Sequence, residues 1–156
     1  MSGANSRDRI GFHHAYLTER PGAIPATFPN DRLYRYTSVD PYISSPDLRR
    51  AVVRTTDHGI AVEITISPIA RKKVNALASW NLKASKDGNF NAHVGLALMV
   101  EGTPVRVIQG IHRLNANLLW LSLDSDGKTQ TQARFWASLI NDANSPITNI
   151  LHPFTD

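Results

Sequence analysis

Cysteine is absent from this chain of 156 residues. Its absence excludes disulfide bonds, zinc sites built on thiolates and thiol nucleophiles. A glycine-rich phosphate loop and the Gly-x-Ser-x-Gly turn of serine hydrolases are missing as well. We therefore expect no catalytic site, no cofactor and no metal, and we predict that the protein is not an enzyme. A hydrolase with an unrecognised site is kept as the lower alternative.

Long apolar runs are also missing. The longest run extends only from Val94 to Val100, whereas a membrane-spanning helix needs about 18 apolar residues or more. We therefore expect no integral membrane segment. The first nine residues are polar and lack the apolar core of a signal peptide. An exported protein with this sequence would therefore have had its export signal removed.

The charged residues are scattered along the chain. The net charge is +4, and the densest basic group is Arg71-Lys72-Lys73. On a helix these three side chains spread over about 200°, which is typical of a solvated face. Basic runs interleaved with aromatic residues are absent, so we expect no nucleic-acid partner.

The histidines and paired acids do not form a recognisable metal shell. His13 and His14 are neighbours, and neighbouring side chains on a strand point to opposite faces. His93 and His112 flank a predicted hairpin and would form a pH-sensitive pair if they met across it, although a structural role is favoured. The segment 124–127 resembles a calcium loop but lacks its later carboxylate, and 57–59 is predicted to be a turn.

Three segments are expected from composition. Residues 1–31 carry Pro21, Pro25 and Pro29, whose spacing forbids a stable helix and favours extended chain. We predict that this Pro-rich segment is dispensable for folding. Residues 32–144 form the α+β domain. Residues 145–156 are apolar enough to form a C-terminal tail that packs on it.

The central segment has clear local signals. Ile60, Val62, Ile64 and Ile66 share one face of a half-buried strand. Further strands are expected at 33–37, 94–100, 104–111 and 118–123, and helices are expected after Ser45-Pro46 and Ser67-Pro68 and at Thr129. A Glu101-Gly102 turn joins two of the strands. This order predicts an α+β, ferredoxin-like fold: an antiparallel sheet of about four to five strands with two main helices packed on one face.

The order of elements from Pro41 to Asp142 resembles the head subdomain of the first periplasmic domain of SecD, a translocon accessory protein. The matching positions are Asp47-Leu48 with Ala51, Val62-Ile64-Ile66, Val74-Leu77, Val100-Glu101-Gly102 with Val105, and Ala133-Ala137-Ile140. The Ala-Pro that follows the acid-Gly turn in that family is absent, and so are its transmembrane helices. The resemblance implies the fold and a tendency to contact polypeptides. It also implies a periplasmic or cell-envelope location, with the cytoplasm as the alternative.

Aromatic and polar residues supply the candidate partner surface. Tyr34 and Tyr36 lie near the first strand of the domain, and tyrosine is frequent at binding hot spots. Glu101, Arg106, Gln109 and Arg113 are predicted to form a polar interface rim on and beyond the hairpin. Strand addition at an open sheet edge is one way in which such a module would bind another polypeptide. The alternative function is an immunity protein or inhibitor that neutralises a secreted toxin.

Overall fold

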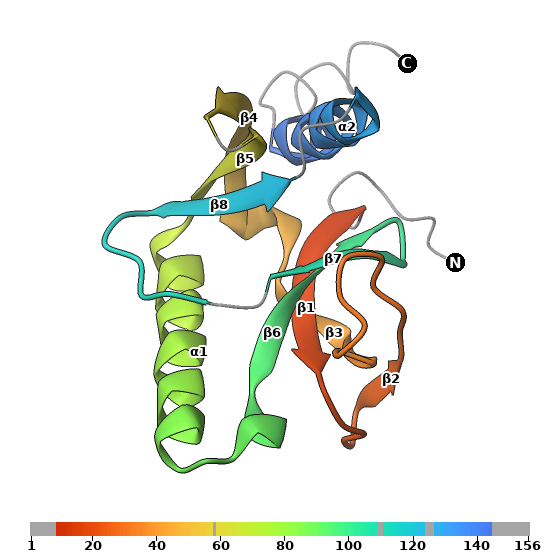
Figure 1. The fold of residues 1–156 in the computed structure, drawn as a ribbon. Coiled ribbons are helices and arrows are strands. Elements are labelled where there is room, and N and C mark those ends of the chain that lie inside the picture. Colours follow the sequence, from red (N-terminus) through yellow and green to blue (C-terminus); the bar gives the residue numbers. More distant parts are fainter. Residues whose placement is uncertain (1–8, 58, 109–110, 124–126, 145–156) are drawn as a thin grey trace.

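The protein is an α+β structure with two antiparallel sheets and two long helices (Figure 1). The computed structural model describes residues 9–57, 59–108, 111–123 and 127–144. The strands are β1 (Ile10–Tyr16), β2 (Ala23–Pro25), β3 (Tyr36–Ile43), β4 (Leu48–Thr56), β5 (Gly59–Ile66), β6 (Val94–Val100), β7 (Thr103–Ile108) and β8 (Leu118–Leu123). The helices are α1 (Pro68–Lys86) and α2 (Gly127–Ala143), and the short 3-10 turns are η2 (Ser45–Asp47) and η3 (Phe90–Ala92). The predicted α+β class is confirmed.

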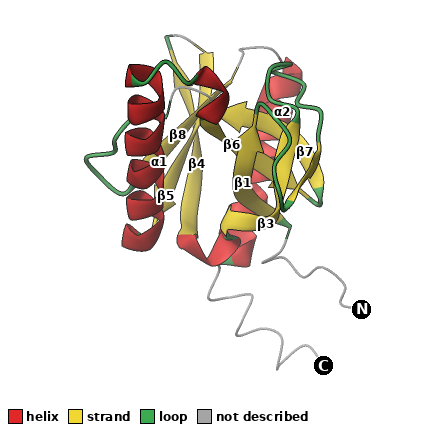
Figure 2. Cartoon of the chain, turned by 90° about the horizontal axis from the view of Figure 1, so that it is seen from below, coloured by secondary structure: helices red, strands yellow, loops and turns green. Residues whose placement is uncertain are grey.

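The strands divide into two sheets instead of one. The five-stranded sheet has the order β2-β3-β1-β6-β7, and the three-stranded sheet has the order β4-β5-β8. Figure 2 shows the two groups of strands apart from each other. Helix α2 packs mainly on β4 and β5, whereas α1 contacts β3 and β6. Apolar side chains from both sheets and both helices nevertheless form one continuous core.

Strand β1 shows that the sheet begins well before residue 32, the predicted start of the α+β domain. It is the central strand of the larger sheet and pairs with β3 on one side and β6 on the other. Phe12 and Ala15 are fully buried on its two faces. The prolines that prompted the expectation all follow β1, so they do not prevent Ile10–Tyr16 from pairing.

The expected strand at 33–37 begins later than predicted. β3 starts at Tyr36, and Leu33 is 70% exposed. Asp31 accounts for the difference, because its Oδ1 accepts a hydrogen bond from the Leu33 amide (2.7 Å) and bends the chain. An isolated bridge between Phe28 and Asp31 completes this turn.

Helix α1 begins where its sequence predicts. The Ser67 hydroxyl accepts a hydrogen bond from the Ala70 amide (3.0 Å), and Pro68 occupies the first turn. Val74 and Leu77 are buried on one face. The predicted helix after Ser45 is only the 3-10 turn η2, because the chain enters β4 at Leu48. Helix α2 begins at Gly127, two residues before the predicted cap.

Four asparagine side chains each bind the amide and the carbonyl of a single residue elsewhere in the chain. We call Asn30, Asn75, Asn81 and Asn141 the asparagine clamps. They bind Val107 (2.9 and 2.9 Å), Leu114 (2.6 and 3.3 Å), Val94 (2.9 and 2.8 Å) and Ala51 (2.8 and 2.9 Å) respectively. A side-chain amide in this arrangement replaces a neighbouring strand, because it offers one donor and one acceptor to the same residue.

Substitution of Asn141 by Ala is expected to lower the free energy of unfolding by about 2 kcal/mol, because two backbone groups of Ala51 lose their partner. Urea denaturation followed by circular dichroism measures the change. The matched control is Asp142→Ala, at an exposed position beside it on α2. Equal stability of the two variants would show that water replaces the clamp without cost.

Candidate functional site

Strand β8 forms an edge of the three-stranded sheet, with β5 on its inner side. The amide of Ile66 donates to the carbonyl of Asn117 (3.0 Å). This pair fixes the alternation of the antiparallel ladder, in which directly opposed residues are hydrogen-bonded at every second position. The backbone groups of Leu118, Trp120 and Ser122 therefore point away from β5. We call these outward-facing groups of β8 the open edge.

In the described part of the chain, neither proline nor charge blunts the open edge. Edge strands are commonly blunted by proline, by charged side chains or by a covering segment. Residues 118–123 contain neither proline nor charge, and Trp120 is 46% exposed. Among the described residues, no side-chain hydrogen bond to the backbone of β8 is found.

The other sheet edges are protected. At β4, the clamp Asn141 binds Ala51, so the backbone groups that face away from β5 are occupied at that position. At β7, Asn30 binds Val107 in the same way, and Pro104 removes a donor. Strand β2 is only three residues long and ends in Pro25. Of the four edges in the described part of the chain, β8 is thus the one with neither a proline nor a side-chain amide bound to its backbone.

The solvent face beside the open edge carries charge. Trp120 is opposite Glu63 in the β5–β8 register, and Glu63 pairs with Arg54 of β4 (3.4 Å). A peptide added to β8 would therefore place alternate side chains next to Trp120 on this face. The opposite face of β8 carries Leu119 and Leu121, which are buried in the core.

The residues predicted from sequence as a partner surface lie in different places. Glu101 is at the tip of the β6–β7 hairpin with φ 52°, followed by Gly102 with φ 80°, as a tight hairpin turn requires. It forms an exposed ion pair with Arg9 (3.2 Å). Arg106 lies on β7 opposite Leu98. Tyr36 pairs with Tyr16 at the start of β3. Gln109 lies outside the described residues, as do 124–126 and the predicted tail 145–156.

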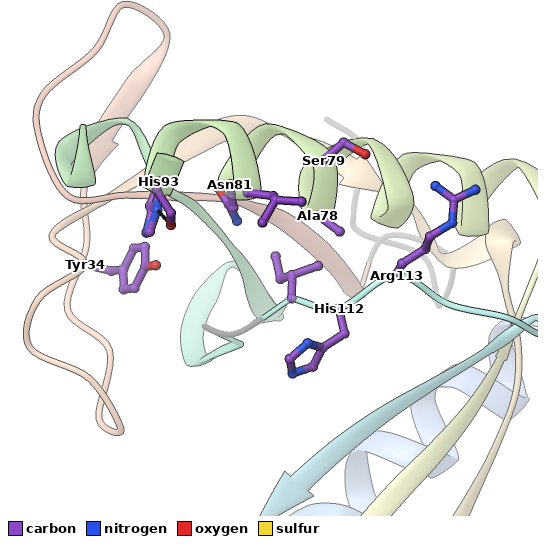
Figure 3. Close-up of a pocket in the computed structure, with 10 residues that line it drawn as sticks. Tyr34, Ala78, Ser79, Asn81, His93, His112 and Arg113 are labelled. Carbon is purple, nitrogen blue, oxygen red and sulfur yellow. Dashed lines mark hydrogen bonds between the residues drawn. The ribbon is translucent and has the colours of Figure 1, made fainter. Parts of the chain in front are cut away.

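Tyr34 and Arg113 are the two predicted residues that the fold brings to one cavity. This cavity, of about 560 Å³, lies between the second half of α1 and the segment 111–113 (Figure 3). His93 and His112, the two histidines that flank the predicted hairpin, line the same cavity. His93 Nε2, however, is hydrogen-bonded to the hydroxyl of Ser85 (2.8 Å).

The hydrogen bond to His93 does not make the Ser85 hydroxyl a good catalytic nucleophile. Ser85 lies in the last turn of α1, where the helix dipole places partial negative charge. That field opposes an oxyanion, which acyl transfer must stabilise. No cluster of three or more potential metal-ligating side chains is found in the described part of the chain. In the same part, no helix is long and apolar enough to cross a membrane.

His14 is half-buried. The sequence suggested only a possible role for it as a metal ligand. The Nδ1 atom of His14 lies 3.0 Å from the Tyr16 hydroxyl, and its ring packs on Tyr42 at 4.1 Å between centroids. Its buried Nε2 has no hydrogen-bond partner among the residues that the structure describes. Burial lowers the pKa of His14, and the nearby charges of Arg20, His13 and Lys73 lower it further. The imidazole is therefore held neutral between the two tyrosines.

Acidification is expected to destabilise the protein through His14. The unfolded chain binds a proton here near the ordinary pKa of 6.5, whereas the folded protein binds it only at lower pH. The contribution of His14 to stability is therefore complete above pH 6.5 and is lost as pH falls through the lowered pKa. Thermal unfolding of His14→Gln between about pH 7.5 and 4.5 should show a smaller acid loss than the parent protein. His13→Gln keeps His14 and its burial, the largest cause of the lowered pKa, and should therefore retain most of the parent's loss. Identical pH profiles for all three proteins would contradict the assignment.

Comparisons with known proteins bear on the fold. No protein-family model and no curated protein sequence matches this chain. Two solved structures are similar, each with 12% sequence identity over 90% of this chain. One is SecDF in its super-membrane-facing form (TM-score 0.53, 19% of that chain covered). The other is described as a membrane component SecDF that enhances protein export (TM-score 0.54, 66% of that chain covered).

The chain has a SecDF-like fold. This confirms the resemblance to SecD at the level of architecture, and it extends the resemblance beyond the residues that carried it in the sequence. Because 90% of the chain is covered, the similarity is larger than the two-thirds expected from Pro41 to Asp142. The chain spans about a fifth of one SecDF chain and just under two-thirds of the other, so the likeness concerns only part of that larger protein.

Proposed function

We propose that this protein is a non-catalytic module of the cell envelope that binds an extended polypeptide by strand addition at the open edge of β8. The observation that carries the proposal is the contrast between β8 and the other edges. Side-chain amides or prolines protect the β2, β4 and β7 edges, whereas β8 presents uncharged, unprotected backbone and an exposed Trp120.

Strand addition supplies affinity through backbone hydrogen bonds and selectivity through alternate side chains. Leu118, Trp120 and Ser122 offer three outward amides and three carbonyls for the backbone bonds. Trp120 offers an apolar contact to side chains on the solvent face. The SecDF-like fold supports a role with polypeptides and an envelope location by analogy, since one SecDF neighbour is described as enhancing protein export.

Ser122→Pro is the direct test. The amide of Ser122 points outward, so proline there removes a donor from the open edge without removing a hydrogen bond to β5. Photo-crosslinking from a benzoylphenylalanine placed at Ala116, an exposed position just before β8, would capture the bound polypeptide in the source cell. We expect Ser122→Pro to abolish the cross-link. Ser122→Thr, which keeps the amide, should retain it.

Hydrogen exchange distinguishes strand addition from other modes of binding. The amides of Trp120 and Ser122 should gain protection when the captured polypeptide is added to the purified protein. A partner that cross-links equally to the proline variant, or that leaves these amides unprotected, would overturn the proposal. The identity of the captured chain also separates a translocation role from that of an inhibitor, because an inhibitor would capture a single toxin.

The hairpin surface with Glu101 and Arg106 is a second proposed contact. Both positions lie on the β6–β7 hairpin of the other sheet. We expect Glu101→Ala and Arg106→Ala to weaken binding of the captured polypeptide if the partner extends beyond β8, with the fold retained. Unchanged affinity for both variants would confine the interface to the open edge.

A further inference from the structure

The residues that line the cavity between α1 and the segment 111–113 are of the types found in ligand sites. Strand addition at β8 would not involve this cavity. Its volume of about 560 Å³ falls within the range of small-molecule sites, which is about 300 to 1,000 Å³. Figure 3 shows Tyr34 and His93 at one end and Arg113 at the other, with α1 along one side. The cavity belongs to the region of α1 and β6, whereas the open edge belongs to the three-stranded sheet.

The lining favours a negatively charged group. None of the ten residues that line the cavity is acidic. The two ion pairs found in the described part of the chain involve Arg9 and Arg54, so neither engages the guanidinium of Arg113. A guanidinium presents a fork of donors that fits a carboxylate in a bidentate arrangement.

The far end of the cavity offers neutral donors. Burial and the charge of Asp31 raise the pKa of Tyr34, so its hydroxyl stays protonated at neutral pH. Gly95 makes room for this ring, because a Cβ at that position would lie 3.2 Å from Tyr34 Cε1. Asn81 also lines the cavity, but its amide is held by Val94 and belongs to the scaffold.

Apolar surface connects the two ends. Ala78, Leu82 and Ile111 also line the cavity, and Leu82 is 58% exposed. An exposed leucine in a concave site is accounted for when an apolar ligand covers it. The arrangement of apolar wall and terminal cation matches a ligand that is apolar along its length and anionic at one end.

We propose that this cavity binds a carboxylic acid with an apolar body, its carboxylate paired with Arg113 and its body lying against Ala78, Leu82 and Ile111. Two sources share this chemistry: a free small acid, and the C-terminal residue of a polypeptide. The inference does not depend on strand addition at β8, since the site and its residues are different.

Nuclear magnetic resonance titration of the full chain tests the proposal. The probes are N-acetyl-L-leucine and, as the uncharged match, N-acetyl-L-leucinamide. We expect the acid to shift the amides of residues 78–85 and 111–113 with saturation, and the neutral amide to bind more weakly by a factor of about ten or more. Equal affinity for the two probes, or no saturable shift at concentrations up to about 20 mM, would overturn the assignment.

The Arg113→Gln variant tests the role of the cation. Arg113 is exposed, so the variant should fold, and its affinity for the acid should fall about tenfold. Arg134→Gln removes the same charge from an exposed position on α2 and should leave the affinity unchanged. A parallel loss in both variants would mean that only the net charge of the protein matters, which contradicts a defined site.

A pentapeptide of four alanines and a C-terminal leucine separates the two sources. If the peptide with a free carboxylate binds at least as well as N-acetyl-L-leucine and its C-terminal amide does not, the site accepts polypeptide ends. If the small acid binds and the peptide does not, the site accepts a free acid. Both results support the shared chemistry. If neither the small acid nor the peptide acid binds, the proposal is contradicted.

Discussion

A protein that lacks residues 1–29 is expected to be insoluble or unfolded. The deletion removes β1, which separates β3 from β6 at the centre of the larger sheet. Both neighbours would then present unpaired backbone where they are now hydrogen-bonded to β1. Loss of the fully buried Phe12 alone costs about 3 to 5 kcal/mol, a large fraction of the total stability of an ordinary domain, about 5 to 15 kcal/mol.

Expression of the truncated chain with circular dichroism and thermal unfolding is the measurement. Full-length Phe12→Ala provides the graded comparison and should remain folded with lower stability, and Phe12→Leu should lose less. A soluble truncated protein with a cooperative transition would show that β3 and β6 pair with each other in the absence of β1. The sequence-based expectation that this segment is dispensable would then be right after all.

Replacement of Ile64 with Asp is expected to unfold the protein. Ile64 is 1% exposed on β5, the central strand of the smaller sheet, with Ala51 and Leu119 opposite it on the two sides. An isolated carboxylate in such a place must lose its hydration or take up a proton, and either costs several kcal/mol. Val74→Asp on α1, also fully buried, should have the same result.

The matched control for Ile64→Asp is Thr65→Asp. Thr65 is the next residue of β5, lies on the opposite, partly exposed face and is opposite Arg50. The control introduces the same carboxylate in the same strand, so β-propensity and net charge change equally. An Ile64→Asp protein with the melting temperature of the control would refute the burial of this face.

Local patterns in the sequence predicted the elements that depend on residues close together in the chain. The alternation at 60–66 predicted β5, and the Ser-Pro signal at 67–68 predicted the start of α1. The Glu101-Gly102 pair predicted a hairpin turn, which joins β6 and β7. Each of these features depends on residues a few positions apart.

The arrangement of strands into two sheets depends on contacts that are distant in sequence. β1 pairs with β6, far along the chain, and no spacing within 10–16 indicates that partner. Its two histidines also weaken the apolar alternation that marks a buried strand. The sequence predicted a strand at 118–123 but not that it is an edge strand, because edge position follows from the whole sheet. For the same reason, Tyr34 and Arg113 were proposed as surface residues and not as the lining of one cavity.

The asparagine clamps make the closure of the sheet edges insensitive to the surrounding solution. An amide side chain neither titrates nor carries a charge, so the contacts that close two sheet edges, at Val107 and Ala51, remain the same in dilute buffer, in concentrated salt and across a wide range of acidity. The two ion pairs of the described residues, at 3.2 and 3.4 Å, are partly exposed, so their contribution to stability falls as the salt concentration rises. Changes in the osmotic and ionic conditions outside the molecule would therefore leave the β4 and β7 edges closed at Ala51 and Val107.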